Sequence, residues 1–441
     1  MEIESDDRKM DEVKVRRYKK FLTGALLGSL LLMAVCIYYN CYAMVPSHLK
    51  VRAGMEQTLE FGVPVTGEFT RKNEYPEAIA VSEQSGSTAM PASISMEMRR
   101  SVTIYALNPE TYQLQLKLFG VIPFKQVEVE VIEDQRLIPA GIPIGIYVKT
   151  EGVLVIGVGE FKKNDGTNTS PSRYLLKAGD YILEADGQKI ESKADFMQKV
   201  AESGGREMVL TIKRGEEIFE VKSVPELNEN GEYKLGIWIR DNAQGVGTLT
   251  FLDEEGGFGA LGHGINDVDT SELLELESGT LYHTEIIAIR KGVSGSPGEM
   301  TGMIDYTEEN ILGNITANCA EGIFGIANAR LWDEVAGEAF PIALKQELHT
   351  GEAKILCTID GYRDYYDIEI TDLHLDHDNV NRGILLEITD SRLLEKTGGI
   401  IQGMSGAPIL QDGRIVGAVT HVLVQDAAKG YGIFIENMLT H

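Results

Sequence analysis

The strongest hydrophobic signal in the chain is an uncharged run at residues 21–39, rich in Leu, Ala, Gly and Met. A helix of this length crosses a hydrocarbon core of about 30 Å. The segment 14–20 just before it holds five basic residues and no acidic one, which predicts a cytoplasmic tail at residues 1–20 and an extracytoplasmic remainder. The alternative is a cleaved signal peptide. The length of the run and the lack of an A-x-A site favour an uncleaved signal anchor, with no second span after it.

Beyond residue 40 the apolar pattern changes to period two, which is typical of strands. The clearest alternation lies in 112–131, with Leu114, Leu116 and Leu118 and later Val127 and Val129. A stretch rich in Ser, Glu, Ala and Pro at 76–98 reads as a linker or long loop. Residues 40–130 are therefore predicted to form a strand-rich extracytoplasmic region with a linker.

Residues 131–226 mix strand patterns with one helix signal and predict an α+β domain. Strands are expected at 145–148, 152–158, 209–213 and 218–221, and a helix start at 192–195 with Gly204 and Gly205 at its end. From residue 227 to 441 many short strands alternate with glycine-rich turns, which predicts a β-sandwich or barrel. The expected fold is thus mostly β, with one N-terminal transmembrane helix.

The stretch L-K-A-G-D-Y-I-L-E-A-D-G-Q-K-I at 176–190 resembles the PDZ family, in which a Gly-Asp turn precedes one strand and an Asp-Gly turn the next. The resemblance implies a groove that binds an extended peptide by strand addition. The peptide-binding residues expected from it are Gly141, Ile142, Pro143, Ile144, Gly145 and Ile146. The alternative is a domain that only packs against its neighbour.

Composition excludes some classes of function. The net charge of −26 leaves no domain-wide basic surface for nucleic acid. Four cysteines are too few for a disulfide scaffold, and Cys319 and Cys357 could be buried thiols or one bridge. The cluster at 374–378 (H-L-D-H-D) looks superficially like a metal site but reads better as a solvated loop. We predict neither a metal nor a cofactor.

The segment most indicative of chemistry is G-M-S-G-A-P at 403–408, followed by a hairpin. It resembles the nucleophile loop of chymotrypsin-like serine peptidases. Glycines permit a tight turn that directs a serine side chain and neighbouring N–H groups to one point. Such a loop supplies a nucleophile, Ser405, together with an oxyanion hole from the N–H groups of Gly403 and Ser405.

A nucleophilic serine needs a base, and His263 is the leading candidate because glycines flank it just after an apolar strand. The third member should orient the imidazole. Spacing alone cannot choose among the candidates Asp267, Asp305, Asp360, Asp364 and Asp390.

A second copy of the Gly-x-Ser-Gly-x-Pro form lies at 292–297 and offers Ser294 as a rival nucleophile. The hairpin after Ser405 resembles the one that follows the chymotrypsin-like nucleophile, and Ser405 gives the chain order His, Asp, Ser. Ser405 is therefore preferred, and Ser294 is expected to lie in a structural turn.

Three stretches resemble the stage IV sporulation protein B peptidase family of endospore-forming bacteria: G-I-W-I-R-D-N-A-Q-G-V-G-T-L-T-F, A-L-G-H-G-I-N-D-V-D-T and Q-G-M-S-G-A-P-I-L-Q-D-G-R-I-V-G-A-V-T-H. The resemblance implies a chymotrypsin-like double β-barrel at 227–441. It also implies a catalytic set of His263, Asp390 and Ser405, and this is why Asp390 leads its rivals.

The family resemblance further implies a sporulation signalling role between the two membranes around the forespore. Such an enzyme cleaves itself and a membrane-bound regulator, and so releases an intramembrane protease that activates the late mother-cell sigma factor. The alternatives are a general envelope quality-control PDZ protease and a PDZ scaffold with an inactive peptidase domain.

Overall fold

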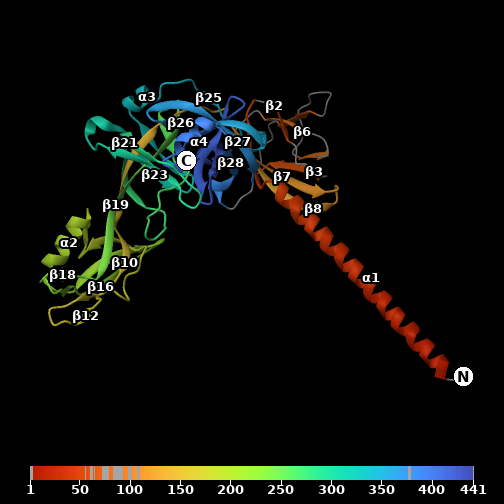
Figure 1. The fold of residues 1–441 in the computed structure, drawn as a ribbon, viewed down its shortest axis with the longest axis horizontal. Coiled ribbons are helices and arrows are strands. Elements are labelled where there is room, and N and C mark those ends of the chain that lie inside the picture. Colours follow the sequence, from red (N-terminus) through yellow and green to blue (C-terminus); the bar gives the residue numbers. More distant parts are fainter. Residues whose placement is uncertain are drawn as a thin grey trace. The chain divides into compact units, whose positions relative to one another are not determined.

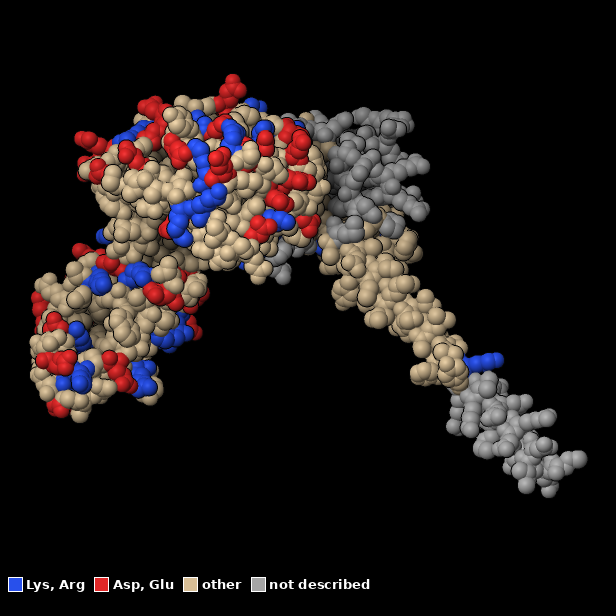
Figure 2. Space-filling model, in the orientation of Figure 1, with Lys and Arg blue, Asp and Glu red and all other residues tan. Residues whose placement is uncertain are grey.

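The computed structural model describes residues 3–54, 110–375 and 379–440, with shorter stretches at 56–59, 63, 65–71, 79–82, 93–97 and 102–106. The chain forms two compact units, residues 1–134 and 135–441, and each is described by itself (Figure 1). Acidic and basic side chains are interspersed over the visible face of the second unit (Figure 2).

The first unit begins with the long helix α1 (Ile3–Met44). Within it, residues 18–43 have a mean hydropathy of 2.1 and are long enough to cross a membrane. The strands that follow it are β1 (His48–Arg52), β2 (Glu56–Leu59), β3 (Val65–Arg71), β4 (Ile79–Ser82), β5 (Ser93–Glu97), β6 (Val102–Ala106), β7 (Thr111–Leu118) and β8 (Ile122–Ile132). β7 and β8 pair antiparallel, and their alternate apolar residues form the core of this unit, as period two predicts. The predicted linker at 76–98 lies largely outside the described residues.

The second unit contains an α+β block, which here means β11–β18 with α2 and the adjoining parts of β10 and β19. Its elements are β11 (Phe161–Lys162), β12 (Asn168–Thr169), β13 (Tyr181–Ala185), β14 (Gln188–Lys189), α2 (Lys193–Glu202), β15 (Met208–Arg214), β16 (Glu217–Ser223), β17 (Glu226–Leu227) and β18 (Tyr233–Lys234). The helix start was predicted correctly, because the Ser192 side chain caps α2 by accepting from the Asp195 N–H at 3.1 Å. Phe196 and Val200 of α2 are buried in the core of the block.

The first β-barrel closes through six strands in the order β10–β19–β20–β24–β23–β21 and back to β10. The elements of this region are β9 (Arg136–Pro139), β10 (Pro143–Val158), β19 (Ile237–Asp253), β20 (Gly257–Ala260), β21 (Leu276–Arg290), β22 (Gly298–Ile304), η1 (Glu308–Asn310), β23 (Ile311–Cys319), β24 (Gly322–Ala327), α3 (Ala329–Val335) and β25 (Phe340–Pro341).

The second barrel closes in the order β26–β27–β28–β32–β31–β30. Its elements are η2 (Lys345–Glu347), β26 (Gly351–Ile359), β27 (Tyr362–Leu373), η3 (Val380–Arg382), β28 (Ile384–Ile388), α4 (Ser391–Thr397), β29 (Ile401–Gln402), β30 (Pro408–Gln411), β31 (Arg414–Leu423), β32 (Asp426–Phe434) and α5 (Ile435–Met438). Each barrel has its own apolar core. The predicted mostly-β fold with an N-terminal apolar helix and a C-terminal barrel architecture is confirmed.

Two strands belong to both the block and the first barrel. β10 pairs with β19 and β21 in the barrel over residues 143–149, and with β13 and β19 in the block over 153–158. β19 runs from the block into the barrel as one strand (Figure 1). The pairing therefore crosses the boundary that the sequence suggested between residues 226 and 227.

All four cysteines carry free thiols. The bridge between Cys319 and Cys357 that the sequence left open is not formed. Cys357 is buried in the core of the second barrel, and its burial raises the pKa of the thiol.

Candidate active site

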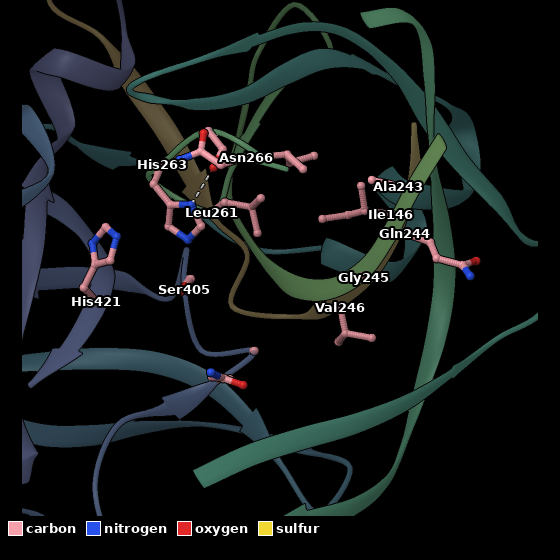
Figure 3. A pocket seen from close by; sticks show the side chains of 14 residues that line it. Ile146, Ala243, Gln244, Gly245, Val246, Leu261, His263, Asn266, Ser405 and His421 are labelled. Atoms are coloured by element: carbon pink, nitrogen blue, oxygen red, sulfur yellow. Dashed lines mark hydrogen bonds between the residues drawn. The ribbon is translucent and has the colours of Figure 1, made fainter. Parts of the chain in front are cut away.

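A cavity of about 410 Å³ brings together residues of both barrels. Its walls come from β19 at 243–246, the loop at 263–266 after β20, and the loop at 402–405 before β30. His263 and Ser405 both line it, together with His421 of β31 (Figure 3). The structure thus places the predicted base and the predicted nucleophile in one site.

Glycines and one buried side chain shape the loop that carries Ser405. Gly403 and Gly406 have φ of 101° and 98°, a region that side chains disfavour. A Cβ on Gly406 would lie 2.0 Å from the Thr248 carbonyl oxygen, so no other residue fits there. Met404, between Gly403 and Ser405, is fully buried in the core of the second barrel and anchors the loop.

The N–H groups expected to form the oxyanion hole are free to bind. In the described residues the N–H groups of Gly403 and Ser405 have no hydrogen-bond partner, whereas that of Met404 donates to the Ile401 carbonyl at 3.1 Å. Unpaired N–H groups beside a serine hydroxyl are the donors that a developing oxyanion needs.

His263 faces Ser405 with one ring nitrogen, while the other contacts a backbone carbonyl (Figure 3). Its Nδ1 lies 2.8 Å from the Gly264 carbonyl oxygen, and a carbonyl can only accept. This contact places the hydrogen on Nδ1 and leaves Nε2 unprotonated, as a general base requires. Burial lowers the pKa of His263 below its usual value, which keeps the ring neutral near pH 7.

Ser405 and His421 complete the polar groups of the cavity. The Ser405 hydroxyl donates to the Thr420 carbonyl at 2.7 Å, so it must rotate to reach His263. The rings of His263 and His421 lie 5.1 Å apart. Burial, with repulsion from His263 and Arg382, lowers the pKa of His421.

Asp390 lies outside this cavity and is engaged by Arg392. It caps α4 by accepting from the Arg392 backbone N–H at 2.8 Å, and its other oxygen accepts from Arg392 Nη2 at 2.8 Å. The hydrogen bond with the Arg392 side chain is the main reason that its pKa falls to about 2. In the described part of the chain, neither Asp390 nor any of its four rivals contacts His263.

The rival serine lies in a turn between β21 and β22, where it has no histidine beside it among the described residues. The Ser294 hydroxyl donates to the Gln425 carbonyl at 2.8 Å, and Gly295 provides the left-handed residue of the turn with φ of 81°.

The family model of the SpoIVB peptidase S55 matches residues 231–439, which contain both His263 and Ser405. Residues 231–439 belong to the SpoIVB peptidase S55 family.

Two further proteins are similar to parts of the chain. A putative zinc metalloprotease from Clostridium perfringens is 29% identical over 143 residues, which are 29% of this chain and 43% of that protein. The chain thus spans less than half of that relative. The PDZ domain of an SdrC-like protein from Listeria monocytogenes is 25% identical and covers 20% of this chain and 87% of that one, with a TM-score of 0.17.

The described residues of the chain, including its SpoIVB peptidase region, contain no group of three His, Cys, Asp or Glu side chains placed to share a metal ion. The cluster at 374–378 lies partly outside them, because residues 376–378 are not described.

The predicted peptide-binding stretch at 141–146 forms part of the barrel of the SpoIVB peptidase region. Ile144 and Ile146 are buried and are paired with β19 on one side and β21 on the other. Both edges of this strand are occupied, so no peptide can add to it there. The resemblance to PDZ domains located the block, but it did not reveal that β10 continues into the barrel.

Several polar residues of the site carried no sequence signal. Thr248 donates through its N–H to the Ser405 carbonyl at 3.0 Å and through its hydroxyl to the Gly403 carbonyl at 2.6 Å. Thr420 accepts from the Ser405 hydroxyl. Both are threonines within strand patterns, where β-propensity alone explains them.

Substitution of Asp390 separates a structural role from a catalytic one. Asp390→Asn removes the ion pair with the half-exposed Arg392 side chain but keeps a good helix cap, and we expect it to lower the free energy of unfolding by about 1 kcal/mol. Because the folded pKa lies below the unfolded one, this stability is present above about pH 4 and is lost as pH falls from about 4 to 2. Denaturant unfolding at pH 7 and pH 3 measures this loss.

The same variant should retain wild-type kcat within about threefold. If Asp390 instead orients the catalytic imidazole, kcat should fall by about 10⁴-fold, and the structural interpretation would then be wrong.

Proposed function

We propose that the chain is a serine endopeptidase with Ser405 as nucleophile and His263 as general base. The observation that carries the proposal is that both side chains line one cavity between two barrels, beside two N–H groups that have no partner among the described residues. Membership of residues 231–439 in a peptidase family supports it.

The geometry suits acyl transfer. As the Ser405 hydroxyl attacks the scissile carbonyl, His263 Nε2 takes its proton, and the N–H groups of Gly403 and Ser405 stabilise the oxyanion. His263 then gives the proton to the leaving amine. Water, activated by the same ring, hydrolyses the acyl-enzyme. The Gly264 carbonyl accepts from His263 Nδ1, where a carboxylate would accept in a Ser-His-Asp triad, and so orients the imidazole.

An extended polypeptide is the substrate that this cavity fits best. Thr248 directs its N–H toward Ser405 and its carbonyl toward Leu261, away from β10. The N–H and C=O groups of successive residues point to opposite sides of a strand, so those of Val246 and Gln244 point away from β10 like those of Thr248. Among the described residues no strand pairs with them on that side. This edge lines the cavity, so a substrate can add to β19 as a strand.

Strand addition predicts a period-two pattern in the substrate. N-methylation of alternate amides in a cleaved peptide should lower kcat/KM about two- to tenfold, since each lost backbone hydrogen bond costs about 0.5–1.5 kcal/mol. The intervening amides serve as matched controls, and equal sensitivity at adjacent positions would contradict the model.

We further propose the biological role that the family resemblance implies. The chain is held by residues 21–39 with its bulk outside the cytoplasm, cleaves itself and a membrane-bound regulator, and so releases an intramembrane protease during sporulation. The apolar helix supports anchoring, and the net charge of −26 suits a role without nucleic acid.

A fluorophosphonate probe tests the chemistry without knowledge of the substrate. We expect it to label the full chain covalently at Ser405, as mapped by mass spectrometry. Labelling at Ser294 would show that the nucleophile is misassigned, and no labelling would favour a scaffold with an inactive peptidase domain.

The rate of labelling should depend on pH through His263. The base must be neutral, and burial lowers its pKa from the usual value of about 6.5. We therefore expect labelling to fall off only below pH 6.5 as the ring becomes protonated. An acid limb above pH 7 would contradict this assignment.

A further inference from the structure

Asn381 of the second barrel reaches across to the loops of the first. It lies in η3, between β27 and β28. Its side-chain Nδ2 donates to the Gly262 carbonyl at 2.6 Å and to the Ala320 carbonyl at 2.7 Å. Both amide hydrogens are therefore used on the first barrel, one of them next to His263.

The same residue is connected to the nucleophile through its backbone. The Thr420 hydroxyl donates to the Asn381 carbonyl at 2.6 Å, and the Thr420 carbonyl accepts from the Ser405 hydroxyl at 2.7 Å. Thr420 is 2% exposed, so this connection is shielded from water. Two hydrogen bonds thus separate Asn381 from Ser405, and one separates it from the residue before His263.

The turn that aims His263 is strained and needs such support. Leu261 and Gly262, the two residues before it, have φ of 69° and 68°, and for a leucine this conformation costs about 1–3 kcal/mol. A backbone in a sparsely populated region persists only where its surroundings hold it. The hydrogen bond from Asn381 to the Gly262 carbonyl acts on this turn directly.

We propose that Asn381 is a positioning residue that sets the His263 ring relative to Ser405. Its side chain bonds to the backbone of the first barrel, and it is not among the residues that line the cavity, so it acts on the rate of the chemical step and not on substrate binding. The inference rests on the proposed serine peptidase function.

The test uses Asn381→Ala and Asn381→Asp in the full chain. The Asp side chain has the same shape, but it faces two carbonyl oxygens with acceptors in place of donors. We expect kcat to fall about 10- to 100-fold, as for displaced catalytic groups, with Asp more impaired than Ala and KM within about threefold of wild type. Fluorophosphonate labelling of Ser405 should slow by a similar factor.

Two controls keep the result decisive. Asn310→Ala removes a side chain that, within the described part of the chain, bonds only to Thr307 in a surface turn, and it should leave both rates unchanged. Asn381→Gln retains both N–H donors. If the loss in the Ala and Asp variants comes from the missing donors and not from a change of fold, the Gln variant should keep at least a third of the wild-type kcat.

The outcomes separate the two proposals. Wild-type kcat in Asn381→Asp, or a loss expressed in KM alone, would overturn the role of Asn381 and leave the peptidase assignment intact. A Gln variant as impaired as Ala, with the same melting temperature as wild type, would do the same. No labelling of Ser405 in the wild-type chain would overturn the proposed function and with it this inference.

Discussion

Replacing Ser405 by Ala is expected to abolish peptide cleavage, including self-cleavage, and fluorophosphonate labelling. The fall in kcat should reach about four to six orders of magnitude, because removal of the nucleophile leaves only the oxyanion donors and substrate binding. Among the residues that the structure describes, the hydroxyl makes one hydrogen bond, to Thr420, so the melting temperature should change by only a few degrees.

Ser294→Ala is the matched control for this experiment. It removes a hydroxyl that also donates to a single backbone carbonyl, but in a turn away from the cavity. It should retain full activity, and equal losses in both variants would show that the cavity is not the site of cleavage.

Replacing His263 by Ala should lower kcat nearly as far as loss of the serine. The two groups act as one unit, and removal of either leaves the other without a partner for proton transfer. The acid limb of the pH profile should disappear with the ring, because His263 is the group that titrates there.

The control histidine is His349, which is exposed and pairs with Asp412 on the second barrel. His349→Ala should keep both kcat and the acid limb of wild type. If the acid limb survives in His263→Ala, another group supplies the base.

The nucleophile loop was the most predictable part of the site. Its glycines are dictated by backbone conformation and close approach, as Gly406 against Thr248 shows, and such constraints are visible in the sequence. His263 could be proposed because glycines flank it after an apolar strand, and Gly262 does have a left-handed φ of 68°.

The role of Asp390 cannot be inferred from its position at a strand end. A carboxylate there can cap a helix or reach a cleft, and only the placement of Arg392 shows that it caps α4. Whether it also serves catalysis stays a prediction that Asp390→Asn tests.

The stretch 141–146 shows a different limit of sequence reasoning. Period two identifies a strand, but it does not identify the partners of that strand. β10 is long enough to pair in both the block and the barrel. Its first half pairs with β19 and β21 of the barrel, so neither edge is open to a peptide. Asn381 gave no signal at all, because an asparagine in a turn is ordinary.

Because β10 and β19 run through both the block and the first barrel, the block is an insertion between two paired barrel strands. Lys149 and Asn242 are direct partners in the β10–β19 ladder, so the chain leaves the barrel and returns to it at neighbouring points. Everything between them is an elaborated hairpin connection, and by loop closure alone residues 150–241 cost about 3 kcal/mol more than a two-residue turn. A tight two-residue turn joining Lys149 to Asn242 should therefore yield a minimal barrel pair that still carries His263 and Ser405.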